Sequence, residues 1–242
     1  MQRILIVKLG STYPELARRR GDFEDWIRTG LGGDSAEGDS GETAVVDPVA
    51  GEALPQPRSF AAIVVTGSHA MVTDRADWSE RTASWLRGAI EAEVPLLAIC
   101  YAHQLLAYAA GGAAGDNPAG REFGTVDMDL TEAAAADPLF SGLPGQFGVQ
   151  VSHAQSALSL PPGAVCLAAS RREPHAAFRV GRCAWGVQFH PEFDADVTRA
   201  SVRHAAADLL AEGQDPDALE AAVRETPHCA AVLARFGRLA IG

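Results

Sequence analysis

The stretch "LLAICYAHQLLAYAAGG" (residues 96–112) joins an apolar run directly to a helical pattern, with Cys100 at the junction. The apolar residues 94–100 predict a buried strand, and residues 101–112 predict a helix that two glycines end. Ligands of open parallel sheets bind beyond the carboxyl ends of the strands. We therefore expect Cys100 at the ligand-binding edge of a sheet.

The first half of the chain repeats this alternation of strand and helix. Continuous apolar strands alternating with helices indicate a parallel sheet covered on both faces. The predicted strands are 3–9, 43–48, 60–68 and 94–100, and the predicted helices before Cys100 are 14–29 and 78–92.

The second half has a different character. Short β-rich segments separated by turn residues fill residues 121–190, which predicts antiparallel strands added to the sheet. Residues 194–213 predict one long helix, and 215–238 one or two more, so that about 213–242 forms a C-terminal helical extension. With neither an internal repeat nor a domain boundary in the pattern, we expect a single domain over residues 1–242.

Charge and patterning exclude several classes of function. The formal net charge is −11, from 20 Lys+Arg and 31 Asp+Glu, and binding to nucleic acid or to an anionic membrane needs a basic face. There is no signal-peptide pattern and no apolar run long enough to span a bilayer. We expect a cytoplasmic protein. The Gly- and acid-rich segment 30–42 predicts a surface loop, either a lid or merely tolerated length.

The four cysteines do not form a pattern of disulfides or of zinc ligands. Cys100 and His103 have the spacing of half a zinc site, but no second close pair completes four ligands. We expect neither a metal nor an organic cofactor. Two interpretations of Cys100 stay open at this point: a buried core cysteine, or the nucleophile of a tight strand-to-helix turn. The cysteines are Cys100, Cys166, Cys183 and Cys229.

A nucleophilic thiol needs a base, and "GVQFHPEF" (186–193) offers one. A strand pattern ends at His190, Pro191 stops the ladder, and Glu192 could orient one nitrogen of the imidazole. The alternative interpretation is a surface turn with a solvated His and Glu.

Taken together, "ICYAHQ", "QFHPE" and "VVTGS" resemble the class I glutamine amidotransferase family, in particular a stand-alone branch similar to the amidotransferase domain of GMP synthase. The resemblance extends over most of the chain, since seven segments fit that branch in order. These are "GDFEDWI", "TGSHAMVTD", "WLRGAI", "ICYAHQLLA", "NPAGREFGTV", "VSHAQSALSLPPGA" and "WGVQFHPEF".

The resemblance implies an α/β fold with a flavodoxin-like, mostly parallel central sheet, helices on both faces and an added antiparallel β portion. It also implies a triad that hydrolyses the side-chain amide of glutamine. Cys100 would be the nucleophile, His190 the general base and then acid, and Glu192 the orienting group. Ammonia and glutamate would be the products.

The same resemblance supplies the remaining site residues. The oxyanion hole would comprise the Tyr101 backbone N–H and the turn Gly67-Ser68. Gln104 would help to hold the substrate, and Ser152 with His153 would line the pocket for its amino-acid end. Gln104 as an ordinary helix residue and His153 as a hydrogen-bonded strand-end histidine are the alternatives. The histidines at 69, 175, 204 and 228 are expected to be structural or solvent-facing.

The sequence departs from the family pattern G-x-C-x-G at the turn around the cysteine, where Ala98 and Ala102 replace the two glycines. Alanine disfavours a positive φ by about 1 kcal/mol. This motivates a catalytically weakened binding or regulatory module as one alternative. A γ-glutamyl peptidase that cleaves other γ-glutamyl amides is another. Since no segment resembles a synthetase phosphate loop, either the ammonia passes to a synthetase that is a separate subunit, or the protein acts alone.

Overall fold

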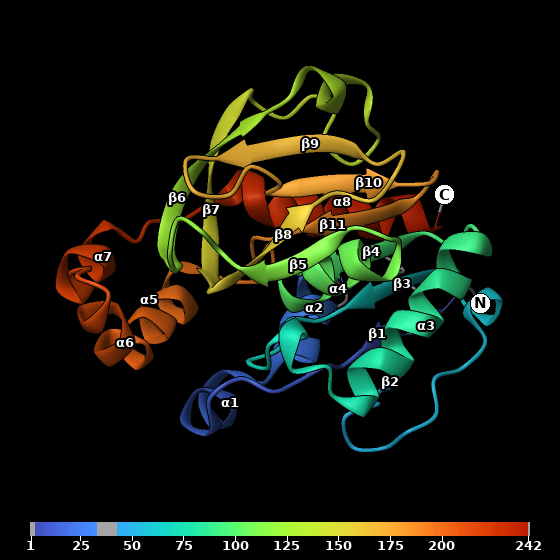
Figure 1. The fold of residues 1–242 in the computed structure, drawn as a ribbon, viewed down its shortest axis with the longest axis horizontal. Helices are drawn as coiled ribbons and strands as arrows, with labels where there is room; N and C mark the ends of the chain where they lie inside the picture. The colour runs from blue at the N-terminus through green and yellow to red at the C-terminus, as the bar shows by residue number, and fades with distance from the viewer. Residues whose placement is uncertain (1–2, 33–42, 242) are drawn as a thin grey trace.

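The computed structural model describes residues 3–32 and 43–241, and the fold is drawn in Figure 1. Most of the predicted segment 30–42 therefore lies outside the described residues. Within the described part, a nine-stranded sheet has the order β2-β1-β3-β4-β11-β10-β9-β6-β7, and β5 pairs with β8 in a small second sheet. The strands are β1 (Ile4–Val7), β2 (Thr43–Val46), β3 (Ala62–Val65), β4 (Leu96–Ile99), β5 (Ala113–Asp116), β6 (Glu122–Leu130), β7 (Gln146–His153), β8 (Gln155–Ser159), β9 (Val165–Ser170), β10 (Ala177–Val180) and β11 (Ala184–Val187).

The strands β2, β1, β3, β4 and β11 run parallel, in the order of a flavodoxin-like doubly wound sheet, with β11 as its fifth strand. The sheet continues from β11 through β10, β9, β6 and β7 with antiparallel pairing. The predicted α/β fold class, with an antiparallel portion added to a parallel core, is confirmed.

Helices cover both faces because the side chains of each strand alternate in direction. In β1, Ile4 and Ile6 join the core under α2 (Phe23–Gly30) and α8 (Pro227–Ile241). Leu5 and Val7 join the core under α3 (Asp77–Glu91) and α4 (Tyr101–Ala109). Burying each such side chain contributes about 1.5–3 kcal/mol. The two cores fix the parallel strands and with them the edge at which Cys100 lies.

The segment expected as a C-terminal extension is part of this covering layer. Val232, Leu233 and Phe236 of α8 are fully buried in the core that α2 shares. Their spacing places all three on one face of a helix. The helix α8 therefore covers the sheet, while α7 (Pro216–Ala222) packs beside α5 (Ala195–His204) and β6.

Two helices expected to be continuous are divided. Residues 14–29 form α1 (Pro14–Arg20) and α2, because Gly21 has a φ of 80° and Asp22 starts α2 with a capping box. Residues 194–213 form α5 and the short α6 (Ala206–Ala211), with a break at Ala205 that has no local signal in the sequence. Figure 1 shows α5, α6 and α7 grouped beside the ends of β6 and β7. Across the described residues, we find no helix that is both long enough and apolar enough to cross a bilayer.

Candidate active site

Cys100 occupies the turn between β4 and α4 in a conformation that is unusual for a residue with a side chain. Its φ and ψ are 51° and −103°, and its backbone N–H donates to the Val187 carbonyl at 2.8 Å. A non-glycine residue at positive φ carries about 1–3 kcal/mol of strain and persists only where its surroundings enforce it. This is the geometry of a strand-to-helix elbow, with the buried Cys100 side chain at its corner.

The alanines on either side of this turn carry no such strain. Among the described residues, the non-glycine residues with positive φ are Arg75, Glu93 and Cys100. Ala98 and Ala102 therefore have ordinary backbone angles, and both are fully buried in the core. The expected penalty for alanine at these two positions does not arise.

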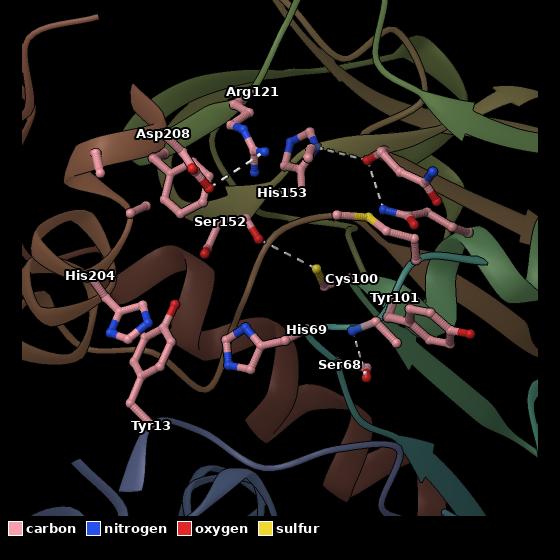
Figure 2. A pocket seen from close by; sticks show the side chains of 18 residues that line it. Tyr13, Ser68, His69, Cys100, Tyr101, Arg121, Ser152, His153, His204 and Asp208 are labelled. Atoms are coloured by element: carbon pink, nitrogen blue, oxygen red, sulfur yellow. Dashed lines mark hydrogen bonds and ion pairs between the residues drawn. The ribbon is translucent and has the colours of Figure 1, made fainter. Parts of the chain in front are cut away.

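The Cys100 thiol borders a cavity of about 410 Å³ and is not sealed in hydrocarbon. The sulfur lies 3.8 Å from the Ser152 carbonyl oxygen, to which the thiol donates. Figure 2 shows the sulfur facing the middle of this cavity, with Ser152 and His153 on one side and the loop after β3 on the other. The cavity lies beyond the carboxyl ends of β3 and β4, where ligands of open α/β sheets bind.

His190 and Glu192 form a buried pair just after β11. The imidazole Nδ1 lies 2.8 Å from Glu192 Oε1, and the side chains of both residues are almost fully inaccessible. The ring also stacks on Phe193, with centroids 3.9 Å apart. Burial by itself lowers the pKa of His190, but the neighbouring Glu192 carboxylate and the Cys100 side chain outweigh it and raise the pKa.

Gly67, which follows β3, borders both Cys100 and His190. A Cβ added at Gly67 would lie 3.2 Å from Cε1 of His190 and 3.6 Å from Cβ of Cys100. The two side chains, ninety positions apart in the chain, thus border the same small space. Parallel pairing of β4 with β11 accounts for this, because it brings the ends of those strands together.

The turn after β3 and the start of α4 both border Cys100. Tyr101 is the first residue of α4, so its N–H lacks an acceptor within the helix. Ser68 lines the cavity, and its hydroxyl accepts from the Ala70 N–H at 3.2 Å. Gly10, after β1, permits this close packing, since a Cβ there would lie 2.9 Å from Ser68 Oγ.

Gln104 fixes one wall of the cavity. Its amide Nε2 donates to the Gln155 carbonyl at 2.7 Å and to Gln188 Oε1 at 3.1 Å. Both amide hydrogens are therefore used within the protein. The side chain ties α4 to the start of β8.

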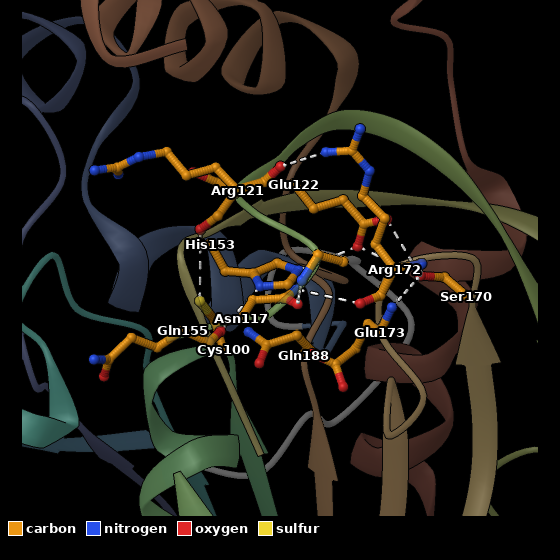
Figure 3. A network of polar contacts seen from close by, with 12 residues as sticks. Cys100, Asn117, Arg121, Glu122, His153, Gln155, Ser170, Arg172, Glu173 and Gln188 are labelled. Carbon is orange, nitrogen blue, oxygen red and sulfur yellow. Dashed lines mark hydrogen bonds and ion pairs between the residues drawn. The ribbon is translucent and has the colours of Figure 1, made fainter. Parts of the chain in front are cut away.

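His153 also makes its contacts within the protein. Its Nδ1 lies 3.0 Å from the Gln155 carbonyl, and its Nε2 lies 3.2 Å from Glu122 Oε2. Glu122 stands directly opposite His153 in the antiparallel β6–β7 pair and also accepts from Ser170 at 3.2 Å. Figure 3 shows this buried polar network behind Cys100. His153 is thus a hydrogen-bonded strand-end histidine whose ring lines the cavity.

Comparison with known proteins shows the family. The family model "Glutamine amidotransferase class-I" matches residues 47–205, which is more than half of the chain and includes both Cys100 and the His190–Glu192 pair. The chain belongs to the class-I glutamine amidotransferase family.

Curated relatives of this chain include GMP synthases that are named as glutamine-hydrolyzing. The chain is 31% identical over 194 residues to that of Thermosipho africanus, covering 79% of this chain and 33% of the relative. It is 38% identical over 131 residues to that of Thermomicrobium roseum, covering 54% and 23%. The chain therefore spans about a third or less of these relatives.

Solved structures share the fold over the full length of the chain. A glutamine amidotransferase from Thermotoga maritima superposes with a TM-score of 0.75 at 21% identity, covering 100% of this chain and 99% of that one. A protein from Thermoplasma acidophilum, named as a subunit of GMP synthase, gives a TM-score of 0.65 at 18% identity, covering 100% and 94%.

The cavity beside Cys100 has a second group of lining residues that sequence reasoning missed. Tyr13, His69 and His204 stack on one another along one side of it, and Arg121 and Asp208 form an ion pair at 3.5 Å on the same rim. The rule that ligands bind beyond strand ends, applied to β1 and β3, could have identified Tyr13 and His69. His204 and Arg121 carry no local signal, because they reach the cavity only through the packing of α5 against β6.

Proposed function

We propose that this protein hydrolyses the γ-amide of glutamine through a covalent intermediate on Cys100. The observation that carries the proposal is the strained elbow at Cys100, whose thiol borders a cavity and the buried His190–Glu192 pair. Membership of the class-I glutamine amidotransferase family supports the choice of glutamine as the acyl donor.

In the proposed first step, the Cys100 thiolate attacks the γ-carbonyl carbon and its electron pair forms the C–S bond. The carbonyl electrons move onto oxygen, where the N–H groups of Tyr101 and of the Gly67-Ser68 turn would stabilise the charge. The C–N bond then breaks as His190, held by Glu192, gives its proton to the departing nitrogen. The products of this step are ammonia and a γ-glutamyl thioester.

In the second step, His190 accepts a proton from water as that water attacks the thioester carbonyl. The C–S bond breaks, glutamate leaves, and the proton returns to the Cys100–His190 pair. The raised pKa of His190 supports this assignment, because an imidazolium that survives at neutral pH can serve as the acid of the first step.

We propose that a synthetase accepts the ammonia. The curated relatives are glutamine-hydrolyzing GMP synthases of which this chain covers about a third or less, and a structural neighbour is named as a subunit of such a synthase. Hydrolysis without an acceptor, as in a γ-glutamyl peptidase, is the second candidate. It is favoured by the cavity's extension beyond Cys100 to the rings of Tyr13 and His204.

The proposal is tested by turnover of glutamine by the purified protein, followed as both ammonia and free glutamate. Cys100→Ala should abolish release of both, a loss of about 10⁶-fold in kcat for removal of a nucleophile. Cys183→Ala, a free cysteine in the turn between β10 and β11, is the matched control and should retain activity. Full activity in Cys100→Ala would refute the assignment.

Labelling separates this enzyme from a catalytically weakened module. A diazo-ketone analogue of glutamine should modify Cys100 stoichiometrically in the native protein. A folded protein that resists labelling and releases no ammonia would favour the module instead.

A further inference from the structure

We propose that Tyr13, His69 and His204 form a subsite for the amine portion of the substrate, and that the enzyme cleaves γ-glutamyl amides whose amine carries a planar aromatic group. This inference rests on the proposed function of Cys100. It adds the residues that select the leaving group and the chemical class of amine that they fit.

The direction in which the leaving amine departs follows from the position of His190. Because His190 would protonate that nitrogen, the amine must lie on the His190 side of the thiol. His69 lies on this side, because it lines the cavity two residues after Gly67, which borders His190 Cε1. Partial burial and then the charges of His190 and His204 lower its pKa. Figure 2 shows His69 standing between Cys100 and Tyr13.

Two more rings, those of Tyr13 and His204, continue outward from His69. The Tyr13 ring stacks on His69 with centroids 4.7 Å apart and an interplanar angle of 30°, and on His204 at 3.5 Å and 19°. Both imidazoles keep exposed surface, and Tyr13, which stacks on both of them, is half-buried. A ligand in the cavity would therefore contact the outer surfaces of the imidazoles and the edge of the Tyr13 ring. A bare ammonia leaving group would make no use of this surface.

The ring wall is held in place before any ligand binds. The Thr12 N–H, next to Tyr13, donates to Asp22 Oδ1 at 2.7 Å, and the Tyr13 carbonyl starts α1 by accepting from Leu16 and Ala17. On the other side, Arg121, just before β6, binds Glu212 at 2.7 Å and so anchors the end of α6. A preformed wall lowers the ordering cost of binding a ring.

Aromatic ligands should bind to such a wall more tightly than saturated ligands of equal bulk do. Offset or edge contacts between rings add a contribution beyond the burial of area, which corresponds to about twofold to tenfold in binding. The acyl end of the substrate would remain on the opposite side, near Ser152 and Gln104. The aromatic amine would therefore change the leaving-group contacts and leave the glutamyl contacts as they are.

The test compares three substrates on the purified protein: glutamine, γ-glutamyl benzylamide and γ-glutamyl cyclohexylmethylamide. The two amides are alkyl amides of similar bulk and differ in the planarity of the ring. We expect kcat/KM for the benzylamide to exceed that for the cyclohexylmethylamide by about threefold to tenfold. Tyr13→Ala should bring this ratio close to one, and Tyr13→Phe, which keeps the ring, should preserve it.

His228→Ala, at an exposed histidine on α8 outside the cavity, is the control and should leave the ratio unchanged. A benzylamide-to-cyclohexylmethylamide ratio of one or below in the native protein would overturn the inference, and so would a ratio that is unchanged in Tyr13→Ala. In either case, hydrolysis of glutamine would still support the proposed function. If the folded protein hydrolyses none of the three substrates, both the proposed function and the proposed subsite are refuted.

Discussion

Two buried histidine–glutamate pairs lie near the cysteine, and they differ in how the two nitrogens of each imidazole are used. His190 contacts Glu192 through Nδ1, at 2.8 Å, and borders Cys100 with the rest of its ring. His153 contacts Glu122 and the Gln155 carbonyl, so both of its nitrogens are used inside the protein.

The difference shows that a buried histidine beside a carboxylate does not by itself make a catalytic pair. A general base needs one nitrogen held and the other directed at the reacting group. His190 has Nδ1 held by Glu192 and borders Cys100, which supports its proposed role, whereas His153 joins β7 to β6 and to the start of β8. We therefore expect changes at the two pairs to affect different quantities, kcat at the first and stability or KM at the second.

The largest expected contrast comes from the histidines themselves. His190→Gln should lower kcat for glutamine by about 10⁴-fold or more, as loss of a triad base does in related chemistry. His153→Gln should lower kcat by tenfold or less and reduce stability by about 1–3 kcal/mol, because Glu122 loses a buried hydrogen-bond partner. Steady-state kinetics with urea denaturation measures both. Equal losses of kcat would show that the two pairs are not distinct.

The second contrast concerns the orienting carboxylate. Glu192→Gln should lower kcat by about 10²–10⁴-fold. Because the negative charge of Glu192 favours the imidazolium, removing it should lower the pKa of His190 and move the alkaline limb of the kcat/KM profile to lower pH. The pH profile of the variant provides the measurement. An alkaline limb that stays in place would contradict the assignment of that limb to His190.

A smaller effect is expected at the space between the thiol and the imidazole. In Gly67→Ala the new methyl would press on His190 Cε1 at 3.2 Å, and a displacement of a few tenths of an ångström should cost about tenfold in kcat. Gly88→Ala in α3 adds a methyl with no atom within 4 Å and should raise helix stability by about 0.5–1 kcal/mol without changing kcat. Thermal melts and kinetics on both variants check this, and a fully active Gly67→Ala would show that the space is more adaptable than its contacts indicate.

The last expected effect concerns stability and not activity, and it comes from a third buried histidine, which packs against an aromatic ring. His103, on α4, contacts Phe178, and burial lowers its pKa to about 3. Since the unfolded chain takes up this proton near pH 6.5 and the folded one does not, stability should fall as the pH drops from about 6.5 towards 3. The limiting slope is about 1.4 kcal/mol per pH unit. His103→Gln should flatten the acid side of a plot of unfolding free energy against pH. An unchanged slope would exclude His103 as its source.

Much of the fold could be predicted from local patterns. The apolar runs marked the first four parallel strands, and the alternation with helices indicated a covered sheet. The fifth parallel strand, β11, lies in the segment expected to be antiparallel, because its parallel partner β4 is far away in the chain. The division at Gly21 could have been predicted from the glycine and the Asp22 cap. The break at Ala205 could not, because it follows from how α5 and α6 pack on Phe123 and Val223.

The candidate site was predictable where its residues lie at the ends of strands. Cys100, Gly67 and His190 each follow an apolar strand, and parallel pairing brings such ends together. Tyr13, His204 and Arg121 are joined only by the packing of separate helices and loops.

The sequence by itself determined the strand–turn–helix corner at Cys100 and the short H-P-E stretch, because these depend on neighbours within a few residues. Only the tertiary structure decided which of two buried histidines borders the thiol, and which rings line the cavity beside it. Those outcomes depend on contacts between segments that are far apart in the chain, and local sequence patterns do not predict such contacts.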